Sequence, residues 1–538
     1  MGIMIKVSLF VLVMLFLSGI SSRSGLKAQV VIDEFVVNDY QMNTVGIWRP
    51  RVAVAPDGSF SVAWQDYNDR PGINFNSVGR SQIAVQRFSA SAQPVGQIHF
   101  FKGESTLSSM WLSDYLEHAE LAYLSTGELL ILMQHAGRFV IGNDDVASSE
   151  VTMGAINANG QIIKLSSTGG NVQYTFGFGT STRQYNPRLA VTPQNLIVAI
   201  LEEKSNDSDF RNVAFRALDT SFNEVITREV PHSDGVGSAP HIIGDMATNG
   251  QLFAAVWQDG RHSNLWSVSV QFYTQQGVVG TNYRMNQVQP GTAFALVPSI
   301  AMNSSGQSVA AWFDSRNGAQ IFGQRFNANG APVGDNFQIS ETPPGGDIYS
   351  RPEIAVRNDG SFMVAWTDST QVPGFFRARA RQFDASGAPS GQPFTITSPE
   401  LASGQPHITT DGTLYYCTWI DNRLQTEQAN VFMKVIGNLA TSRHDDQLAF
   451  PHRIRLHQNY PNPFNPSTNI RFDLPAESPV VIDIYTITGQ LVMRLINETR
   501  PAGAHTATFD AGRLTSGVYL YRLQAGTFSA TGKMMLLK

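Results

Sequence analysis

The sequence contains little cysteine and little charge. It has one cysteine, Cys417, in 538 residues, and 15% of its residues are charged. A single cysteine excludes a disulfide framework and any cysteine-based zinc or iron–sulfur site. The 38 Lys and Arg against 43 Asp and Glu give a net charge of −5, which argues against nucleic acid as a main partner. Glycine (46 residues) and hydrophobic residues (42%) are plentiful instead. This composition favours an all-β fold with more than one domain.

The N-terminus has the layout of a targeting segment. Lys6 precedes an almost unbroken apolar run over residues 7–17, and Ala28 offers a small residue before a cleavage point. The run is short for a membrane span. We therefore predict a secretory signal peptide over residues 1–28 and an exported protein.

A repeated motif fills residues 29–440. Each clear copy begins with a proline, continues through an Asp-Gly or similar turn, and ends in a tryptophan. Two degenerate copies lack the tryptophan. The seven copies start at Pro50, Ala119, Pro187, Pro240, Pro298, Pro352 and Pro406. Each unit is predicted to form four short strands with a tight turn between the first two. Four strands in each of seven units predict a seven-bladed β-propeller.

The last copy lacks a fourth strand, and a matching segment stands at the other end of the domain. Residues 31–38 resemble the fourth strands of two other units. Phe35, Tyr283 and Phe337 each lie 15 positions before the next proline of the repeat. We expect the N-terminal strand to complete the last blade and close the ring, so that no sheet edge stays open.

Two residue types recur at fixed places in the repeat. Repetition around a ring argues for a structural role, because an active site is built once. We expect the tryptophans to pack between blades and the acidic residues two positions later to hold loops. The tryptophans are Trp64, Trp257, Trp312, Trp366 and Trp419, and the acidic residues are Asp66, Asp259, Asp314 and Asp421. Cys417 falls on the same apolar face and is expected to be buried and inert.

No catalytic residue can be assigned from the sequence. There is no metal-ligand spacing, phosphate-binding glycine loop or nucleophile motif, so we expect no metal and no cofactor. Long loops on a rigid ring often carry binding. The long loops of the first three units contain Trp111, Tyr174, Phe176 and Phe178, which we expect to line a surface for an extracellular glycan or protein. We expect binding or adhesion rather than catalysis. The alternative is a sialidase-like propeller glycan hydrolase with unassigned carboxylates.

A polar linker over residues 441–455 separates the repeats from a second domain over residues 456–538. That domain is predicted to contain about seven short strands, which is typical of an immunoglobulin-like sandwich. Its first part is a proline-rich run, and glycine- and tyrosine-containing turns follow. These residues are Asn459, Tyr460, Pro461, Asn462, Pro463, Phe464, Asn465, Pro466, Gly489, Gly503, Gly517, Tyr519 and Lys533.

This segment resembles the type A C-terminal sorting domain of the type IX secretion system. The resemblance implies export through the periplasm to the outer surface of a Gram-negative bacterium, or release from it. It also implies two partners, the type IX secretion machinery and its processing protease. The exposed linker is where a protease could cut.

Overall fold

The computed structural model contains two compact units, residues 1–441 and residues 442–538. It describes residues 28–38, 44–68, 80–102, 111–141, 144–163, 174–175, 182–205, 211–229, 241–260, 266–287, 292–318, 320–341, 351–368, 376–397, 403–421, 430–439, 455–456, 459, 462–474, 478–500, 503–526 and 528–537. All regular structure in these ranges is β-strand. The predicted signal peptide lies almost wholly outside the described residues. Within them, no helix is long and apolar enough to cross a membrane.

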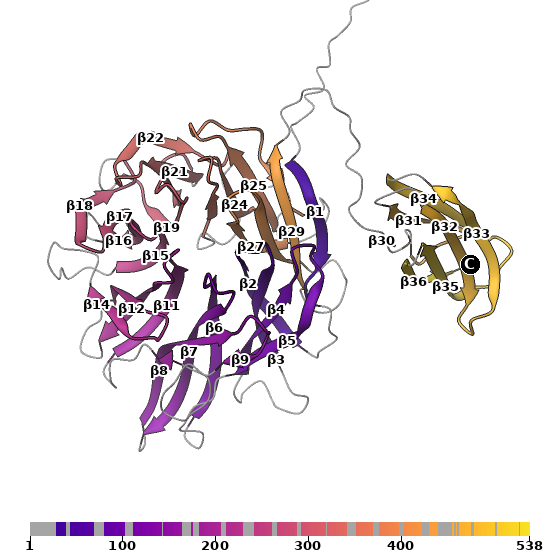
Figure 1. The fold of residues 1–538 in the computed structure, drawn as a ribbon, viewed down its shortest axis with the longest axis horizontal. Coiled ribbons are helices and arrows are strands. Elements are labelled where there is room, and N and C mark those ends of the chain that lie inside the picture. Colours follow the sequence, from indigo (N-terminus) through magenta and orange to yellow (C-terminus); the bar gives the residue numbers. More distant parts are fainter. Residues whose placement is uncertain are drawn as a thin grey trace, which may run out of the picture. The chain divides into compact units, whose positions relative to one another are not determined.

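Unit 1 is built from seven antiparallel units, here called blades 1 to 7, of which six have four strands and blade 2 has five (Figure 1). Blades 1 and 2 are joined by a short parallel contact between β4 and β6. Blade 1 is β2 (Thr44–Val54), β3 (Phe60–Asn68), β4 (Arg80–Phe88) and β5 (Pro94–Lys102). Blade 2 is β6 (Trp111–Tyr123), β7 (Leu129–Ile141) and β8 (Asp144–Ile156), with the short strands β9 (Ile162–Ile163) and β10 (Tyr174–Thr175). Blade 3 is β11 (Thr182–Val191), β12 (Ile197–Ser205), β13 (Arg211–Leu218) and β14 (Glu224–Glu229).

The remaining blades follow the same order. Blade 4 is β15 (His241–Thr248), β16 (Phe253–Asp259), β17 (Ser267–Thr274) and β18 (Gly277–Arg284). Blade 5 is β19 (Ala295–Met302), β20 (Ser308–Asp314), β21 (Gln320–Phe326) and β22 (Pro332–Gln338). Blade 6 is β23 (Glu353–Val356), β24 (Phe362–Asp368), β25 (Arg377–Phe383) and β26 (Phe394–Thr395). Blade 7 is β27 (Ser403–Thr410), β28 (Tyr415–Asp421) and β29 (Asn430–Leu439), together with β1 (Ala28–Val36).

The first strands of successive blades contact one another, and β27 contacts β2, so unit 1 is a closed ring (Figure 1). The all-β propeller class predicted from the repeats is confirmed. The second and third strands of the blades are largely buried, because neighbouring blades cover both of their faces. β16 and β20, for example, are buried at every residue. Apolar clusters therefore form between neighbouring blades rather than in one central core.

Blade 7 takes its fourth strand from the N-terminus. β1 pairs antiparallel with β29, and Val36 lies opposite Phe432. The Val431 N–H donates to Asn38 Oδ1 at 2.7 Å. Asn286 and Ser340 accept from the third strands of blades 4 and 5 in the same way. β1 thus stands where the fourth strand stands in the other blades.

Unit 2 is a sandwich of two antiparallel sheets. One sheet has the order β30 (Arg455–Leu456), β31 (Ser467–Leu474) and β34 (Gly503–Asp510). The other has the order β33 (Leu491–Arg500), β32 (Ser478–Thr486), β35 (Gly517–Ala525) and β36 (Phe528–Leu536). Its core is separate from that of unit 1 and centres on Phe472, Ile482 and Phe509. These strands form the immunoglobulin-like fold expected from the sequence.

Candidate functional site

A β-bulge in the first strand of six blades directs one side chain of each blade toward the centre of the ring. The pairing of first and second strands shifts register at this point, for example between Trp48 and Arg51 and between Tyr185 and Arg188. The residue two positions before the shifted one has a left-handed backbone in five blades, such as Arg49 at φ 51° and Gln405 at φ 50°. Bulges of this kind re-aim side chains. The re-aimed residues are Arg51, Glu120, Arg188, Asp245, Ser299 and His407, and Glu353 holds the same register in blade 6.

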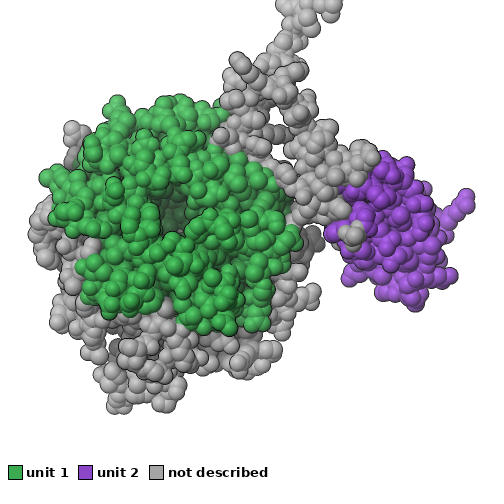
Figure 2. Space-filling model, viewed as in Figure 1, with its two compact units in different colours: residues 1–441 green, residues 442–538 purple. Residues whose placement is uncertain are grey.

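Six charged side chains form a closed cycle of ion pairs, here called the channel ring. The N–O distances are 3.2 Å for Arg51–Glu120, 3.3 Å for Glu120–Arg188 and 3.6 Å for Arg188–Asp245. The cycle continues at 3.8 Å for Asp245–Arg351, 3.0 Å for Arg351–Glu353 and 3.9 Å for Glu353–Arg51. These side chains are 10–17% exposed. Unit 1 is hollowed at its centre (Figure 2).

Blade 5 contributes no charge to the ring, and blade 6 contributes two. Ser299 occupies the ring position of blade 5, and Arg351 reaches past it to blade 4, where its Nη1 donates to the Gly244 carbonyl at 2.6 Å. A Cβ on Gly244 would lie 2.4 Å from the Pro298 carbonyl oxygen. Only glycine therefore fits there. Gly244, rather than Pro240, is the structural counterpart of the repeat proline in blade 4, because Asp245 pairs with Val256 as Arg51 pairs with Ala63.

The three carboxyl groups of the ring differ in their pKa values. Burial alone would raise the pKa of Glu353, but Arg351 and Arg51 outweigh it and hold the pKa at about 2. The pKa of Glu120 is also lowered, because Arg51 and Arg188 outweigh its burial. Asp245 behaves in the opposite way. Its burial outweighs the more distant Arg351 and Arg188, so its pKa is raised.

Two histidines beside the ring are neutral near pH 7. Burial, and then the charge of Arg51, lowers the pKa of His407 to about 4. His407 Nδ1 accepts the Val52 N–H at 3.2 Å, which leaves the proton on Nε2, and Nε2 lies 4.0 Å from Glu353 Oε2. The pKa of His118 is well below its ordinary value because of burial and then the charge of Arg49.

Two large aromatic side chains are exposed on blades 1 and 6, one in β2 and one directly before β25. Trp48 is 48% exposed and Phe376 is 38% exposed. The segment of Gly404 and Gln405 in blade 7 lies between them. The Arg49 N–H donates to Gln405 Oε1 at 2.8 Å. Phe376 Cβ lies 3.9 Å from the point where a Cβ on Gly404 would stand. Trp48 lies three residues before Arg51 of the channel ring in the same strand, β2.

The repeated tryptophans and acidic residues lie inside the blades. All five predicted tryptophans are at most 2% exposed. The indole of Trp312 donates to Asp314 at 2.9 Å, and that of Trp257 donates to Asp259 at 3.3 Å. Asp66 and Asp421 are buried at the matching places. Arg316 pairs with Asp314 at 2.6 Å. Cys417 is buried, and burial raises the pKa of its thiol to about 12.

The predicted ligand-binding aromatics are largely outside the described structure. The backbone of Trp111 begins β6 and that of Tyr174 begins β10. Their side chains, and the whole of Phe176 and Phe178, are not among the described parts of the chain. No group of three or more potential metal ligands occurs within the described ranges.

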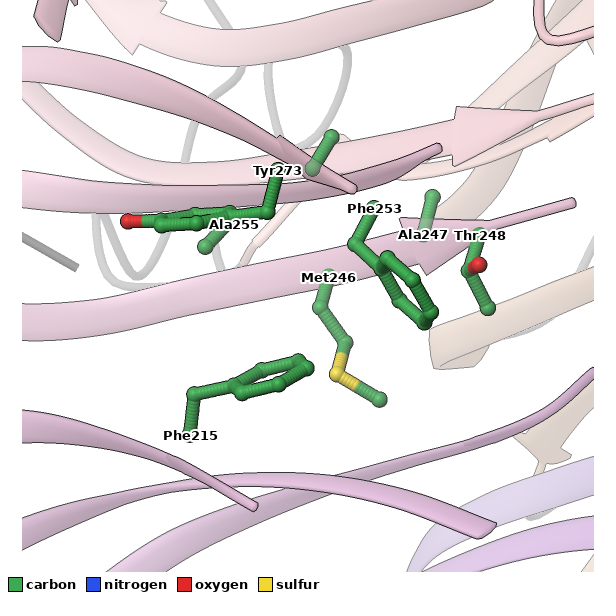
Figure 3. A pocket seen from close by; sticks show the side chains of 8 residues that line it. Phe215, Met246, Ala247, Thr248, Phe253, Ala255 and Tyr273 are labelled. Carbon is green, nitrogen blue, oxygen red and sulfur yellow. The ribbon is translucent and has the colours of Figure 1, made fainter. Parts of the chain in front are cut away.

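A small apolar pocket lies between blades 3 and 4 (Figure 3). Its space is about 10 Å³, roughly that of one water molecule. The side chains of Phe215, Met246 and Phe253 converge on it, and the rings of Phe215 and Phe253 are 5.8 Å apart. It is a packing gap between blades and not a ligand site.

Residues of the C-terminal motif hold unit 2 together. Buried Asn459 donates from Nδ2 to Thr468 at 2.9 Å, and Phe464 packs on Phe509 at 5.9 Å between ring centroids. The proline-rich segment lies along β36, where the Phe464 N–H donates to the Met535 carbonyl and Asn462 Oδ1 accepts the Met535 N–H. Tyr519 donates to the Thr515 carbonyl at 2.8 Å, and Gly489 takes the positive φ that its turn requires. Tyr460 and Pro461 are outside the described residues.

Residues 458–537 match the family model described as a secretion system C-terminal sorting domain. The chain is thus an all-β protein with an export module at its C-terminus. That module is a sorting domain of the type IX secretion system, which directs export across the outer membrane to the cell surface or beyond. The predicted family, location and secretion-machinery partner are confirmed.

The comparison with curated proteins found no match. Among solved structures, a Dyadobacter fermentans protein of unknown function is similar at 10% identity and a TM-score of 0.42, over 76% of this chain and 99% of that one. A Penicillium chrysogenum α-L-arabinanase is similar at 15% and 0.35, over 76% and 98%. A Trypanosoma rangeli sialidase is similar at 8% and 0.37, over 91% and 84%. At these values the likenesses carry no argument about activity.

Proposed function

We propose that this chain is an exported surface protein that binds an extracellular glycan or protein over the mouth of its propeller channel. One observation carries the proposal, namely the exposed aromatic side chains of Trp48, which lies three residues before Arg51 of the channel ring, and of Phe376. Large aromatic side chains with a polar neighbourhood are the usual anchors of a binding surface. The sorting domain supports it, because an exported protein meets ligands outside the cell. Trp111, Tyr174, Phe176 and Phe178 are proposed to extend this surface.

The test uses the full chain on an array of glycans and surface proteins. Replacing Trp48 and Phe376 together with Ala is expected to weaken binding at least tenfold, about 1.4 kcal/mol or more. The matched control is Val278→Ala in β18, because Val278 is equally exposed at 48% but far from the channel in sequence and sheet position. Replacing Trp111, Tyr174, Phe176 and Phe178 with Ala tests the loops separately. Unchanged binding in both aromatic variants contradicts the proposed surface.

Cleavage of a bound glycan is a second candidate function. The pKa of Asp245 is raised and that of Glu353 is lowered, and glycoside hydrolysis uses two carboxyl groups whose environments shift their pKa values apart.

A further inference from the structure

The outer face of the four-stranded sheet in unit 2 is apolar at one end. An antiparallel sheet that packs one face on a core normally presents polar residues on the other face. The inner face here carries Ile482, Tyr521 and Leu536 of the unit 2 core, and the residues that alternate with them face outward. At one end of the sheet these outward residues and one residue of the turn after β32 form a group, here called the outer patch. Its members are Tyr485, Ile487, Leu491, Val518, Leu520 and Met535.

The register of the sheet places these side chains next to one another. Leu491 lies opposite Tyr485, and Tyr485 lies opposite Leu520, in one row across β33, β32 and β35. Val518 lies opposite Met535 in the adjacent row across β35 and β36. Side chains that are opposite each other on one face have Cβ atoms about 5 Å apart. The outer patch is therefore continuous across all four strands.

The outer patch is open to solvent. Ile487 is 67% exposed, Leu491 is 50% exposed and Met535 is 40% exposed. Within the described residues, five of the eleven exposed large hydrophobic side chains lie in unit 2, although it is much the smaller unit. Single exposed apolar residues are ordinary, whereas a contiguous group of them marks an interaction site.

The edge of β36 next to the outer patch is already paired. The Phe464 N–H donates to the Met535 carbonyl at 2.9 Å, and the Leu537 N–H donates to the Phe464 carbonyl at 3.0 Å. The Asn462 side chain accepts the Met535 N–H at 2.8 Å and donates to the Lys533 carbonyl at 3.3 Å. A partner therefore cannot add a strand at this part of the edge. It can reach the sheet here only through the side chains of the outer patch.

Charged residues border the outer patch, and cations outnumber carboxylates among them. Asp483 lies opposite Arg494 on one side and opposite Arg522 on the other, in the row next to the apolar one. Lys533 lies opposite Leu520 and is exposed. Three cations and one carboxylate leave a net positive border. The complementary surface of a partner is therefore apolar with an acidic rim.

We propose that the outer patch is the surface on which the type IX secretion machinery docks this chain, through an apolar groove with an acidic rim on one component of that machinery. The family match shows that unit 2 is recognised by this machinery. A second copy of the chain fits the patch less well, because a stable dimer needs about 20–30 residues from each partner. A small patch suits a contact that must release the chain after export.

The test follows export of the full chain in a bacterium that has a type IX secretion system. Leu491→Glu and Met535→Glu, introduced together, place negative charges against the acidic rim of the partner. The fraction of the chain at the cell surface or in the medium is expected to fall about tenfold or more, with accumulation in the periplasm. The matched control is Thr499→Glu with Ser529→Glu, because both residues are exposed in the same two strands at their opposite ends. This control is expected to keep wild-type export.

Two further measurements separate docking from folding. Calorimetry of the purified double variant is expected to show unit 2 unfolding as in wild type, because both substituted side chains are exposed. Leu491→Ile with Met535→Leu keeps the patch apolar and is expected to be exported normally. A photoreactive residue in place of Ile487 is expected to cross-link the chain to a component of the secretion machinery during export, and one in place of Ser529 is not.

Four results overturn the proposal. One is wild-type export of the double glutamate variant, and another is an equal loss of export in the matched control. A third is a cross-link from position 487 to a second copy of the chain or to unit 1, which would give the patch another occupant. If the double variant fails to fold, Ile487→Glu alone decides, since Ile487 is 67% exposed in a turn. Wild-type export of that single variant is the fourth result.

Discussion

The two units hold their distinctive residues in opposite ways. In unit 1, the six members of the channel ring are spread from Arg51 to Glu353, and only closure of the propeller brings them together. In unit 2, the sorting motif is largely a single run from Asn459 to Pro466, followed by glycine-marked turns. A site built from repeats is therefore hard to recognise in the sequence, because its members lie on different blades and differ in residue type. A linear motif, by contrast, can be recognised from consecutive residues alone.

The largest expected effect separates the export function of unit 2 from the folding of unit 1. Deleting residues 456–538 is expected to leave unit 1 folded, since the two cores are separate, but to abolish delivery to the surface. Cell fractionation should find the truncated chain in the periplasm. Normal surface delivery of the truncated chain would contradict the role of unit 2 in export.

Replacing a buried tryptophan tests whether the two units also unfold independently of each other. Trp312→Ala is expected to lower the free energy of unfolding of unit 1 by about 3–5 kcal/mol, because it empties a fully buried site and removes the hydrogen bond to Asp314. All eight tryptophans precede residue 420, so tryptophan fluorescence in a urea titration reports unit 1 alone. The control Tyr521→Ala, in the core of unit 2, should leave that transition unchanged.

An ion pair can be broken in each unit for comparison. Arg351→Met is expected to cost unit 1 about 3–5 kcal/mol, because it leaves two buried carboxylates without their shared partner. Arg494→Met in unit 2 should cost much less, since Arg494 is 50% exposed where it pairs with Asp483. Equal losses, measured by urea unfolding of each unit, would mean that the channel ring contributes no more than a surface pair.

The smallest effect concerns pH. The folded-state pKa of His407, about 4, lies below its ordinary value of 6.5. The unfolded chain therefore binds more protons between these values, and stability falls as the pH drops from about 6.5 to 4. Glu353, whose pKa falls from 4.5 to about 2, extends the loss at lower pH. His407→Gln should flatten the first part of this decline in unit 1. An unchanged slope between pH 6.5 and 4 would contradict the role of His407.

The sequence predicted the features that repeat or run consecutively. The turns and tryptophans indicated the blades, the spacing of Phe35 from Pro50 indicated the closing strand, and the proline-rich run indicated the sorting domain. The channel ring was missed because its members alternate in charge and therefore do not look like a repeat. The usable signal for Arg51, Arg188 and Glu353 was their place directly after the repeat proline. In blade 4 even that signal failed, because Gly244 takes the place of the proline.

The pairing of β1 with β29 also has a mechanical consequence. β29 is the last strand of the ring, and it is held by β28 on one side and by β1 on the other. Any pull on the segment that follows Leu439 during export acts along this strand and is resisted by two ladders of hydrogen bonds at once. β1 thus stabilises β29 against tension that is applied at the C-terminal end of unit 1.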